Sequence, residues 1–322
     1  MAQNQATNSA TRNLRAAVIG VGYLGRFHAQ KYCNLPGVDL VAVADSVLAT
    51  AQAVGAELNV PVTNHYQELL AKVDLVSVVV PTPLHFAVAA DFLRHKVHVL
   101  VEKPITETIE QAQQLISLAR EHHCILQVGH LERFNPAIQA AARQIRSPRF
   151  IESHRLAPFK QRGTDVSVVL DLMIHDIDLI QELVGQPITH IDAVGSPIFS
   201  HDIDIANARI RFADGCVANT TASRVSLKQE RKLRIFQDDA YISVDLQQKI
   251  LTVVRKKDSG PIESPAQVSI DEQSFDQGDA LKSEVEAFVH AVRSGSTPVV
   301  SGEDGLRALT TAMQITDLVN AK

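Results

Sequence analysis

The chain of 322 residues has only three cysteines, no tryptophan and no long apolar run. The cysteines (Cys33, Cys124 and Cys216) are odd in number and far apart, which argues against a disulfide framework and a cysteine metal site. All three lie in or beside apolar segments, so we expect buried thiols in a reduced, cytoplasmic protein. No run is long enough to cross a bilayer, so no membrane partner is expected. Residues 1–13 are polar and are predicted to form a flexible tail rather than a secretory signal.

A strong charge of either sign is also absent. The formal net charge is −5, so nucleic acid is not expected as a partner. The chain shows no internal repeat and no low-complexity stretch. Its apolar content of 45% is ordinary for a globular protein, and its length suffices for two domains with separate cores.

Strand-like and helix-like segments alternate up to residue 129. Apolar runs predict strands at 14–20, 38–44, 75–80, 97–101 and 125–128, with helices at 23–34, 48–58, 66–71, 86–94 and 106–121. Strands that are apolar throughout and alternate with helices are typical of a doubly wound parallel α/β sheet. Thr106, ahead of Ile109 and Glu110, marks the expected start of the last of these helices.

Beyond residue 129 the pattern becomes that of an α+β domain. Helices are expected at 135–146 and at 166–184, the second ended by Gly185. Strands are predicted at 188–195, 203–212, 216–223, 232–236, 240–245 and 250–254, with hairpin turns at 213–215 and 237–239. Residues 255–276 are expected to leave the sheet, and two amphipathic helices, 280–293 and 303–319, follow. The sequence thus predicts a second domain over residues 130–322 with a large, mostly antiparallel open sheet, whose exposed face favours a homo-oligomer (dimer or tetramer).

Three glycines mark the first strand-to-helix turn. Gly20, Gly22 and Gly25 have the spacing G-x-G-x-x-G. This spacing lets the chain turn sharply, approach a pyrophosphate closely and pack the helix on the strand, while the helix N-terminus offers N–H groups to phosphates. Alone, the motif is equally consistent with an ordinary glycine turn. The flanking strand and helix, and Asp45 at the end of the second strand, favour a dinucleotide-binding Rossmann domain over residues 14–129.

Asp45 also indicates which dinucleotide is bound. A carboxylate at this position accepts hydrogen bonds from both ribose hydroxyls and would repel a 2′-phosphate. The next residues are Ser46, Val47 and Leu48, without the arginine that a 2′-phosphate would favour. NAD is therefore the predicted cofactor.

Two further motifs lie at the ends of predicted elements. The tripeptide E-K-P occupies 102–104, and D-L-M-I-H-D-I-D occupies 171–178. Together with the glycine turn they resemble the family of glucose–fructose oxidoreductase and inositol dehydrogenase (Gfo/Idh/MocA). The resemblance extends over nearly the whole chain after residue 13.

Without the resemblance, these residues leave other interpretations open. Lys103 ends a parallel strand, where ligands bind, but a surface lysine would also fit there. Pro104 predicts a fixed turn, with a cis Lys103–Pro104 bond as one form. Asp171, His175 and Asp178 are predicted to share a helical face, which equally suits an acid paired with a histidine for stability. A metal is not expected, since no clear ligand set is evident.

The resemblance implies a catalytic group of Lys103, Asp171 and His175. His175 would take the hydroxyl proton, Lys103 would polarise the developing alkoxide, and Asp171 would share the proton relay or position the substrate hydroxyl. Which of Lys103 and His175 is the base stays open. Glu102 is expected to hold the turn through backbone N–H groups. The residues expected to bind the cofactor are Gly20, Gly22, Tyr23, Leu24, Gly25, Asp45, Pro81, Thr82, His85, Glu102 and Lys103.

Within the family, residues 128–136 and 171–178 resemble the branch that oxidises UDP-N-acetylglucosamine at C3. Members of that branch feed an aminotransferase, for example in lipid A precursor synthesis. A group of basic residues before the long helix suits a diphosphate, although each member also fits a solvated basic face: Arg133, Arg149, Arg155, Lys160 and Arg162. Substrate contacts are expected from Lys103, His130, Arg133, Lys160, Arg162, Asp171 and His175. A dehydrogenase of free polyols or sugars is the main alternative. A non-catalytic NAD-binding regulator is a second alternative, disfavoured by the complete catalytic group.

Overall fold

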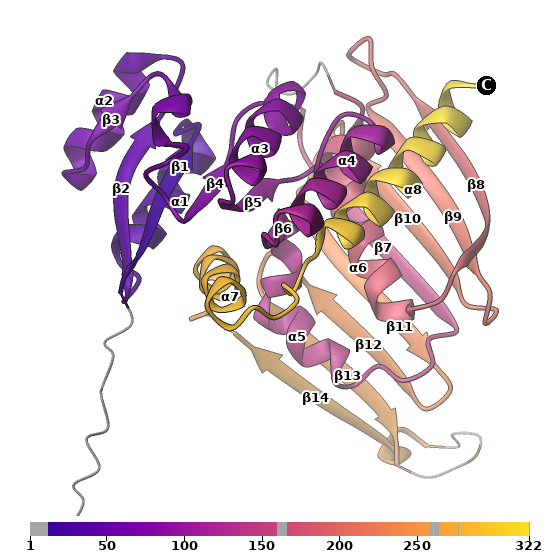
Figure 1. Cartoon of the computed structure of the whole chain (residues 1–322). Helices are drawn as coiled ribbons and strands as arrows, with labels where there is room; N and C mark the ends of the chain where they lie inside the picture. The colour runs from indigo at the N-terminus through magenta and orange to yellow at the C-terminus, as the bar shows by residue number, and fades with distance from the viewer. Residues whose placement is uncertain (1–11, 160–165, 258–259, 261–263, 276, 322) are drawn as a thin grey trace, which may run out of the picture.

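Two β-sheets with their helices organise the chain (Figure 1). The computed structural model describes residues 12–159, 166–257, 260, 264–275 and 277–321. The first sheet has six parallel strands in the order β3-β2-β1-β4-β5-β6, and the second has eight strands in the order β14-β13-β12-β11-β7-β10-β9-β8. The predicted α/β class, with a doubly wound sheet followed by a large and mostly antiparallel one, is confirmed.

The first sheet follows the predicted alternation closely. Its strands are β1 (Leu14–Ile19), β2 (Val38–Ala44), β3 (Val62–Thr63), β4 (Leu75–Val78), β5 (His98–Glu102) and β6 (Leu126–Gly129). Its helices are α1 (Tyr23–Cys33), α2 (Leu48–Leu58), α3 (His85–Arg94) and α4 (Ile109–Glu121). The short strand β3 was not expected, and the helix predicted at 66–71 is a 3-10 turn at Tyr66–Leu69.

The expected start of α4 is wrong by two residues. The hydroxyl of Thr108 accepts a hydrogen bond from the Gln111 N–H and caps the helix. The hydroxyl of Thr106 donates instead to the Thr108 carbonyl, so it holds the chain leading into the cap.

The second sheet contains two strands that the sequence pattern did not indicate. Its strands are β7 (Phe150–Leu156), β8 (Ile188–Ser196), β9 (Ile205–Phe212), β10 (Val217–Ser223), β11 (Glu230–Gln237), β12 (Ala240–Asp245), β13 (Ile250–Lys256) and β14 (Val268–Ser274). β7 was missed, and the prediction that 255–276 leaves the sheet is wrong, since β14 pairs with β13. β7 runs parallel to β10 at the centre, and the other pairings are antiparallel.

The described part of the second half has four helices: α5 (Pro136–Ala142), α6 (Ile174–Val184), α7 (Ala280–Ser294) and α8 (Gly302–Asn320). Three of them, α5, α6 and α8, cover one face of this sheet. Buried residues of α5, α6 and α8, such as Ile177 and Ala312, pack with Ile151, Ile235 and Ile242 of the sheet. In Figure 1 these three helices lie on the side of the sheet that faces the first half of the chain.

The last two helices return to the first sheet. Val285, Phe288 and Val289 of α7 are buried in one cluster with Val18 and Val43. Helix α8 contacts α6 and β8 in the second half, and α4 and β6 in the first. The core beneath the first sheet is therefore completed by the C-terminal end of the chain.

The three free cysteines differ in burial. Cys216 is buried and Cys124 is partly buried, but Cys33 is exposed at the end of α1, so the expectation of a buried thiol is wrong there. In the part of the chain that the structure describes, no helix combines the length and apolar character needed to traverse a bilayer.

Candidate active site

A cleft of about 770 Å³ lies along the carboxyl ends of β1, β2, β4 and β5. Ligands bind at this edge of open α/β sheets, because the strand ends and the following helix N-termini converge there. All eleven residues predicted to bind the cofactor line it: Gly20, Gly22, Tyr23, Leu24, Gly25, Asp45, Pro81, Thr82, His85, Glu102 and Lys103. The sequence pattern thus located one continuous surface, although contact of these residues with a cofactor stays a prediction.

The glycine turn leaves space for a phosphate group. Gly20 has φ +85°, and a side chain at Gly25 would meet the Gly20 carbonyl oxygen, since its Cβ would lie only 1.8 Å away. A Cβ at Gly22 would meet nothing within 4 Å, so the space above it is open. No side chain caps the N-terminus of α1, which leaves its N–H groups and positive dipole end for an anion. These features fit a dinucleotide pyrophosphate.

Asp45 is fixed at the cleft by the backbone. Its Oδ2 accepts a hydrogen bond from the Val21 N–H (3.0 Å) and its Oδ1 accepts one from the Val47 N–H (2.9 Å). Among the described residues that line the cleft, Lys103 is the single lysine and there is no arginine. The adenosine side therefore presents a carboxylate and no strong cation, which suits a ribose with free hydroxyls.

Sequence reasoning missed the part of the lining that follows β3. Asn64, His65, Tyr66 and Gln67 lie there, next to Ser46. Because β3 neighbours β2 in the sheet, the loop after β3 must lie beside Asp45. The signal was weak, since a strand of two residues leaves little apolar pattern.

His85 has a structural role at the edge of this cleft. It is buried, its Nδ1 lies 2.8 Å from the carbonyl oxygen of Pro104, and its Nε2 lies 2.9 Å from that of Val80. Burial lowers the pKa of His85, although the nearby carbonyls oppose this shift. The imidazole thus links the loop after β4 to the loop after β5.

Lys103 meets the second half of the chain at Asp171. The Lys103 Nζ donates to the Asp171 carbonyl oxygen (2.7 Å) and lies 3.6 Å from the Asp171 Oδ1. The lysine side chain is only 18% exposed, unlike an ordinary surface lysine. Burial lowers the pKa of Lys103, while the charges of Asp171 and Glu102 oppose that shift. The Lys103–Pro104 bond is cis, in line with the predicted turn.

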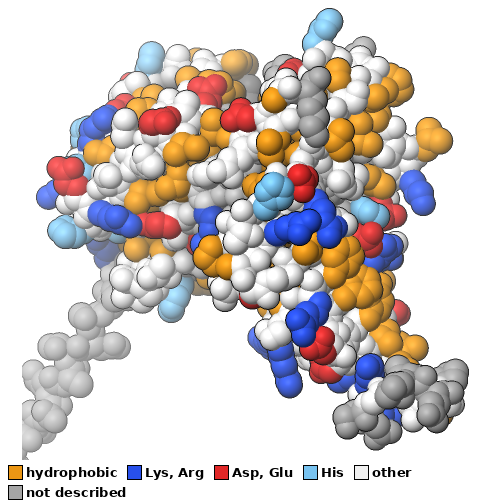
Figure 2. All heavy atoms as spheres, turned by 90° about the vertical axis from the view of Figure 1, so that its right-hand side faces the viewer, with side chains coloured by type: hydrophobic (Ala, Val, Ile, Leu, Met, Phe, Trp, Pro, Cys, Tyr) orange, Lys and Arg blue, Asp and Glu red, His pale blue; other side chains and the backbone are white. Residues whose placement is uncertain are grey.

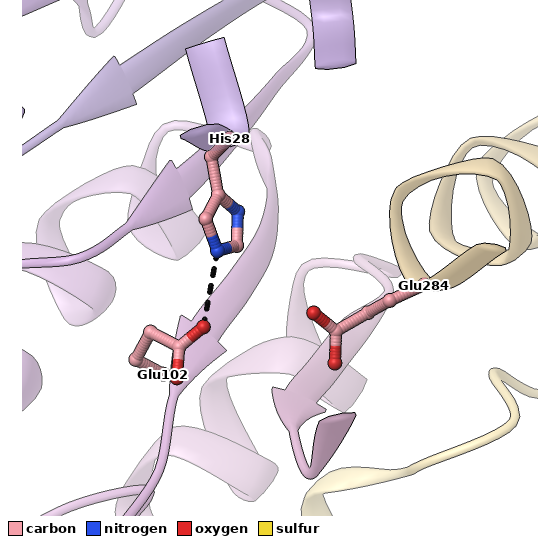
Figure 3. Close-up of side chains that lie close together, drawn as sticks. All are labelled: His28, Glu102 and Glu284. Carbon is pink, nitrogen blue, oxygen red and sulfur yellow. Dashed lines mark hydrogen bonds and ion pairs between the residues drawn. The ribbon is translucent and has the colours of Figure 1, made fainter. Parts of the chain in front are cut away.

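Behind Lys103 lies a buried group formed by Glu102, His28 and Glu284 (Figure 3). The Oε1 of Glu102 lies 3.1 Å from the His28 Nε2, and its Oε2 accepts a hydrogen bond from the Lys103 N–H (3.3 Å). This backbone contact is the one expected of Glu102. No metal was expected here, yet the three side chains are close enough to reach one ion. His28 already uses both ring nitrogens, because its Nδ1 contacts the Ser77 hydroxyl.

The two carboxyl groups of this buried group have opposite pKa shifts. Burial raises the pKa of Glu102, but His28 and Lys103 outweigh it and lower the value. Burial and the charge of Glu102 raise the pKa of Glu284 far above its usual range. Neither Glu284 oxygen has a hydrogen-bond partner among the described residues. The opposite shifts favour a proton on Glu284 beside a charged Glu102.

Asp171 and His175 lie on either side of a change in helix geometry. Asp171 belongs to a π-helical turn at Val169–Met173, and His175 lies in the first turn of α6. The Nδ1 of His175 is buried and has no hydrogen-bond partner among the described residues. Burial, followed by the positive charges of Lys103 and Arg155, lowers the pKa of His175 well below 6.5. The imidazole is therefore neutral and able to accept a proton.

Asp178 does not join this group. It is buried and accepts two hydrogen bonds from Arg133 (2.8 and 2.7 Å). Arg133 is itself only 6% exposed and also contacts Glu182 at 2.8 Å. Arg133 and Asp178 therefore neutralise each other in a buried ion pair, while contact of Arg133 with a diphosphate stays a prediction.

The other expected substrate residues lie in different surroundings. Arg155 is buried and bonded to Asp176 and Glu132. Arg149 is exposed and paired with Asp238, at the opposite end of β7 from Arg155. His130 is buried, with neither ring nitrogen hydrogen-bonded to a described residue. Lys160 and Arg162 lie outside the described residues.

Comparison with known proteins fits this geometry. A family model described as "Oxidoreductase family, NAD-binding Rossmann fold" matches residues 14–130, and one described as "GFO/IDH/MocA C-terminal domain" matches residues 137–243. The chain belongs to the Gfo/Idh/MocA family of oxidoreductases. The predicted family membership is confirmed.

Individual relatives are similar over nearly the whole chain. A UDP-N-acetylglucosamine 3-dehydrogenase from Acidithiobacillus ferrooxidans is 40% identical over 310 residues, covering 96% of this chain and 98% of that protein. A crystal form of that enzyme superimposes with a TM-score of 0.91 at 40% identity, over 96% of this chain and 98% of that one. The scyllo-inositol 2-dehydrogenase (NAD(+)) of Bacillus subtilis is 28% identical over 90% of both chains. A scyllo-inositol dehydrogenase from Lactobacillus casei, solved with NAD(H) and scyllo-inositol, shares the fold (TM-score 0.80, 20% identity, 96% of this chain and 98% of that one).

Proposed function

We propose that this oxidoreductase uses NAD to oxidise the C3 hydroxyl of UDP-N-acetylglucosamine to a ketone. The observation that carries the proposal is the meeting of Lys103 with Asp171 beside a neutral His175, at the end of the cofactor cleft. The 40% identity with a UDP-N-acetylglucosamine 3-dehydrogenase supports this choice of substrate. The inositol dehydrogenases among the relatives favour a free polyol as the second candidate.

Each residue of the catalytic group has a distinct role in this proposal. Nicotinamide, when bound, takes the hydride from the sugar carbon. His175 accepts the hydroxyl proton, because burial and neighbouring cations keep its imidazole neutral. The Lys103 ammonium stabilises the negative charge that develops on the substrate oxygen. Asp171 holds that ammonium in place through its carbonyl oxygen and carboxylate.

NAD, rather than NADP, follows from the adenosine side of the cleft. Asp45 is fixed there by two backbone N–H groups, and no arginine lines the described part of the cleft. A 2′-phosphate would lie against this carboxylate without a compensating cation. Tighter binding of NADP than of NAD, or faster turnover with NADP at equal concentration, would contradict the assignment of NAD.

The first experiment measures NADH absorbance after the protein is mixed with NAD and UDP-N-acetylglucosamine. Parallel reactions contain free N-acetylglucosamine or an inositol. We expect a signal with the nucleotide sugar, and a signal with inositol alone would favour the second candidate. No reaction with any of these substrates, in a sample that binds NAD, would favour a regulator.

The catalytic roles are tested by Lys103→Met and His175→Ala. Acid–base assistance contributes about a hundredfold to ten-thousandfold, so we expect kcat losses of that order while NAD affinity changes little. The rate of the unmodified enzyme should fall as the pH drops through the lowered pKa of His175, because protonated imidazole cannot accept the proton. Near-normal turnover of both variants would refute these roles.

We also propose that the protein acts as a homo-oligomer in the cytoplasm. The face of the large sheet opposite the helices carries the aromatic rings of Phe150, Phe236 and Tyr241 in contact with one another, with centroids 5.7 and 5.0 Å apart. Figure 2 shows hydrophobic side chains interspersed with charged ones on the side of the molecule that it views. A second copy would cover such a face. A monomeric mass at micromolar concentration would contradict this.

The ketone product also has a consequence for partners. A 3-keto sugar is an electrophile that an aminotransferase can convert to an amine. We therefore propose an aminotransferase as the enzyme that consumes the product. Coupling the reaction to a transaminase that acts on the keto sugar should increase NADH yield if oxidation alone is unfavourable.

A further inference from the structure

Arg231 is a cation near the catalytic group that was not predicted from the sequence. It is the second residue of β11, on the same face of the strand as the buried Leu233 and Ile235. It therefore points to the side of the sheet that the helices cover. Its backbone is fixed, because its carbonyl accepts a hydrogen bond from the Leu246 N–H (2.9 Å).

The register of the sheet places Arg231 directly opposite Arg155 of β7. Side chains that face each other across an antiparallel pair lie on one face and within a few ångströms, and like charges in this position repel. Arg155 has neutralising partners, since it is bonded to Asp176 at 2.8 Å and to Glu132 at 3.1 Å. Arg231 has no hydrogen bond or ion pair through its side chain within the described part of the chain, and it is exposed.

The position of Arg231 relative to the catalytic group follows from the same contacts. Asp176, which holds Arg155, is the neighbour of His175 in α6. Arg155 and Arg231 are both among the cations whose charge acts on His175. Arg231 does not line the cofactor cleft. Its charge acts on His175 from outside that cleft, and among the described residues no carboxylate forms an ion pair with it, although Glu132 and Asp176 influence it.

We propose that Arg231 binds the diphosphate of the substrate nucleotide while the sugar ring lies between Lys103 and His175. This rests on the proposed function. A guanidinium suits a diphosphate because its fork of N–H donors matches two phosphate oxygens. Arg133, Arg149 and Arg155, the described arginines expected in this role, already hold carboxylates. An arriving diphosphate would also relieve the repulsion between Arg231 and Arg155.

The test compares Arg231→Gln with Arg234→Gln. Arg234 lies three residues further along β11, points to the opposite face and is paired with Glu152 at 2.8 Å, so it is a matched control. Titration calorimetry measures binding of UDP to each protein saturated with NADH. We expect Arg231→Gln to weaken UDP binding by about tenfold to a hundredfold, and Arg234→Gln to leave it unchanged. Binding of NADH, measured alone, should be the same in all three proteins and reports that the variants are folded.

Kinetics separate binding from chemistry. For UDP-N-acetylglucosamine, Arg231→Gln should raise KM while kcat falls little, and Arg231→Lys should restore part of the affinity because it retains the charge. Equal UDP affinity in Arg231→Gln and the unmodified protein would overturn the role of Arg231 and leave the proposed function standing. If the unmodified protein binds NADH but neither binds UDP nor oxidises the nucleotide sugar, the proposed function and this assignment both fall.

Discussion

At the scale of single residues, the site combines ionised and neutral groups at short range. Two carboxyl groups enclosed by protein cannot both ionise at low cost. Glu102 is ionised because His28 and Lys103 favour its charge, and Glu284, with no hydrogen-bond partner for its carboxyl group among the described residues, keeps its proton. The two carboxyl groups beside Lys103 therefore carry one negative charge between them.

This arrangement predicts that Glu284→Gln stabilises the protein in a pH-dependent way. The folded-state pKa of Glu284 is raised above its ordinary 4.5. Its contribution to stability is fully present below 4.5 and is lost as the pH rises towards the folded pKa, since the unfolded chain gives up the proton first. Glutamine has no such loss. We expect the variant to match the unmodified protein below about pH 4.5 and to gain about 1.4 kcal/mol per pH unit above that, until the pH reaches the folded-state pKa of Glu284.

Urea denaturation at pH 5, 6.5 and 8 measures this difference in the free energy of unfolding. The control is Glu286→Gln, because Glu286 lies two residues further along α7, is 45% exposed and is 3.7 Å from Lys282. Its stability difference from the unmodified protein should stay flat across this pH range. If Glu284→Gln instead became less stable relative to the unmodified protein as the pH rises, Glu284 would be ionised in the folded state.

Breaking the buried ion pair of Arg133 and Asp178 should lower the stability strongly and change the catalytic rate little. Arg133→Met leaves the buried Asp178 carboxylate without its partner, which costs about 3–5 kcal/mol. Adding Asp178→Leu removes the orphaned charge and should recover most of that loss. Chemical denaturation of the single and double variants measures both effects. Arg149→Gln, at an exposed pair, should leave the unfolding midpoint unchanged; an equally large loss there would contradict the distinction.

At the scale of elements, two glycines of the same turn have different roles. Gly25 allows α1 to pack closely on β1, and Gly22 leaves space for a ligand. Gly25→Ala forces a methyl group onto the Gly20 carbonyl oxygen, so α1 must move from β1 at a cost of about 1–3 kcal/mol. Gly22→Ala places its methyl group in open space and should change stability by less than about 0.5 kcal/mol. It should still weaken NADH binding, because that space is where we expect the pyrophosphate. Thermal unfolding and NADH fluorescence titration distinguish the two effects, and unchanged NADH affinity in Gly22→Ala would contradict the cradle.

The elements that the sequence failed to predict share a physical cause. β7 places Ser153 and Arg155 at positions that face the core, so it lacks the apolar alternation of a half-buried strand. β14 is an edge strand, mostly exposed and joined to β13 through its backbone, so its side chains need no pattern. Strands that bury apolar side chains on both faces, such as β2 and β4, were predicted almost to the residue.

The residues of the candidate site also differ in whether the sequence could predict their roles. Residues that follow strand ends, including Asp45 and Lys103, were predictable because topology brings those ends together. The roles of the arginines were not predictable, because they depend on which carboxylate lies nearby after folding. Arg133 looked free in the sequence and is paired with Asp178, whereas Arg231 was overlooked in a strand and is unpaired among the described residues.

At the scale of the whole molecule, the first sheet depends on residues from the other end of the chain. α7 buries Val285, Phe288 and Val289 under it, and the Arg293 guanidinium donates to the Gly37 carbonyl (2.7 Å). α8 adds contacts to α4 and β6 while packing on the large sheet. The core of the first sheet is therefore incomplete without the second half, and we expect the two halves to unfold together.

Phe288→Ala tests this coupling. The side chain is fully buried in the core of the first sheet, so its removal should cost about 3–5 kcal/mol. Because α7 reaches the first sheet from the second half of the chain, we expect one shared transition to shift, rather than an early transition of one half. NADH binding reports on the first half and circular dichroism on both, so their urea midpoints should fall together. If NADH binding were lost well before the circular dichroism changed, the first half would be an independent folding unit, and α7 would be only an attached helix.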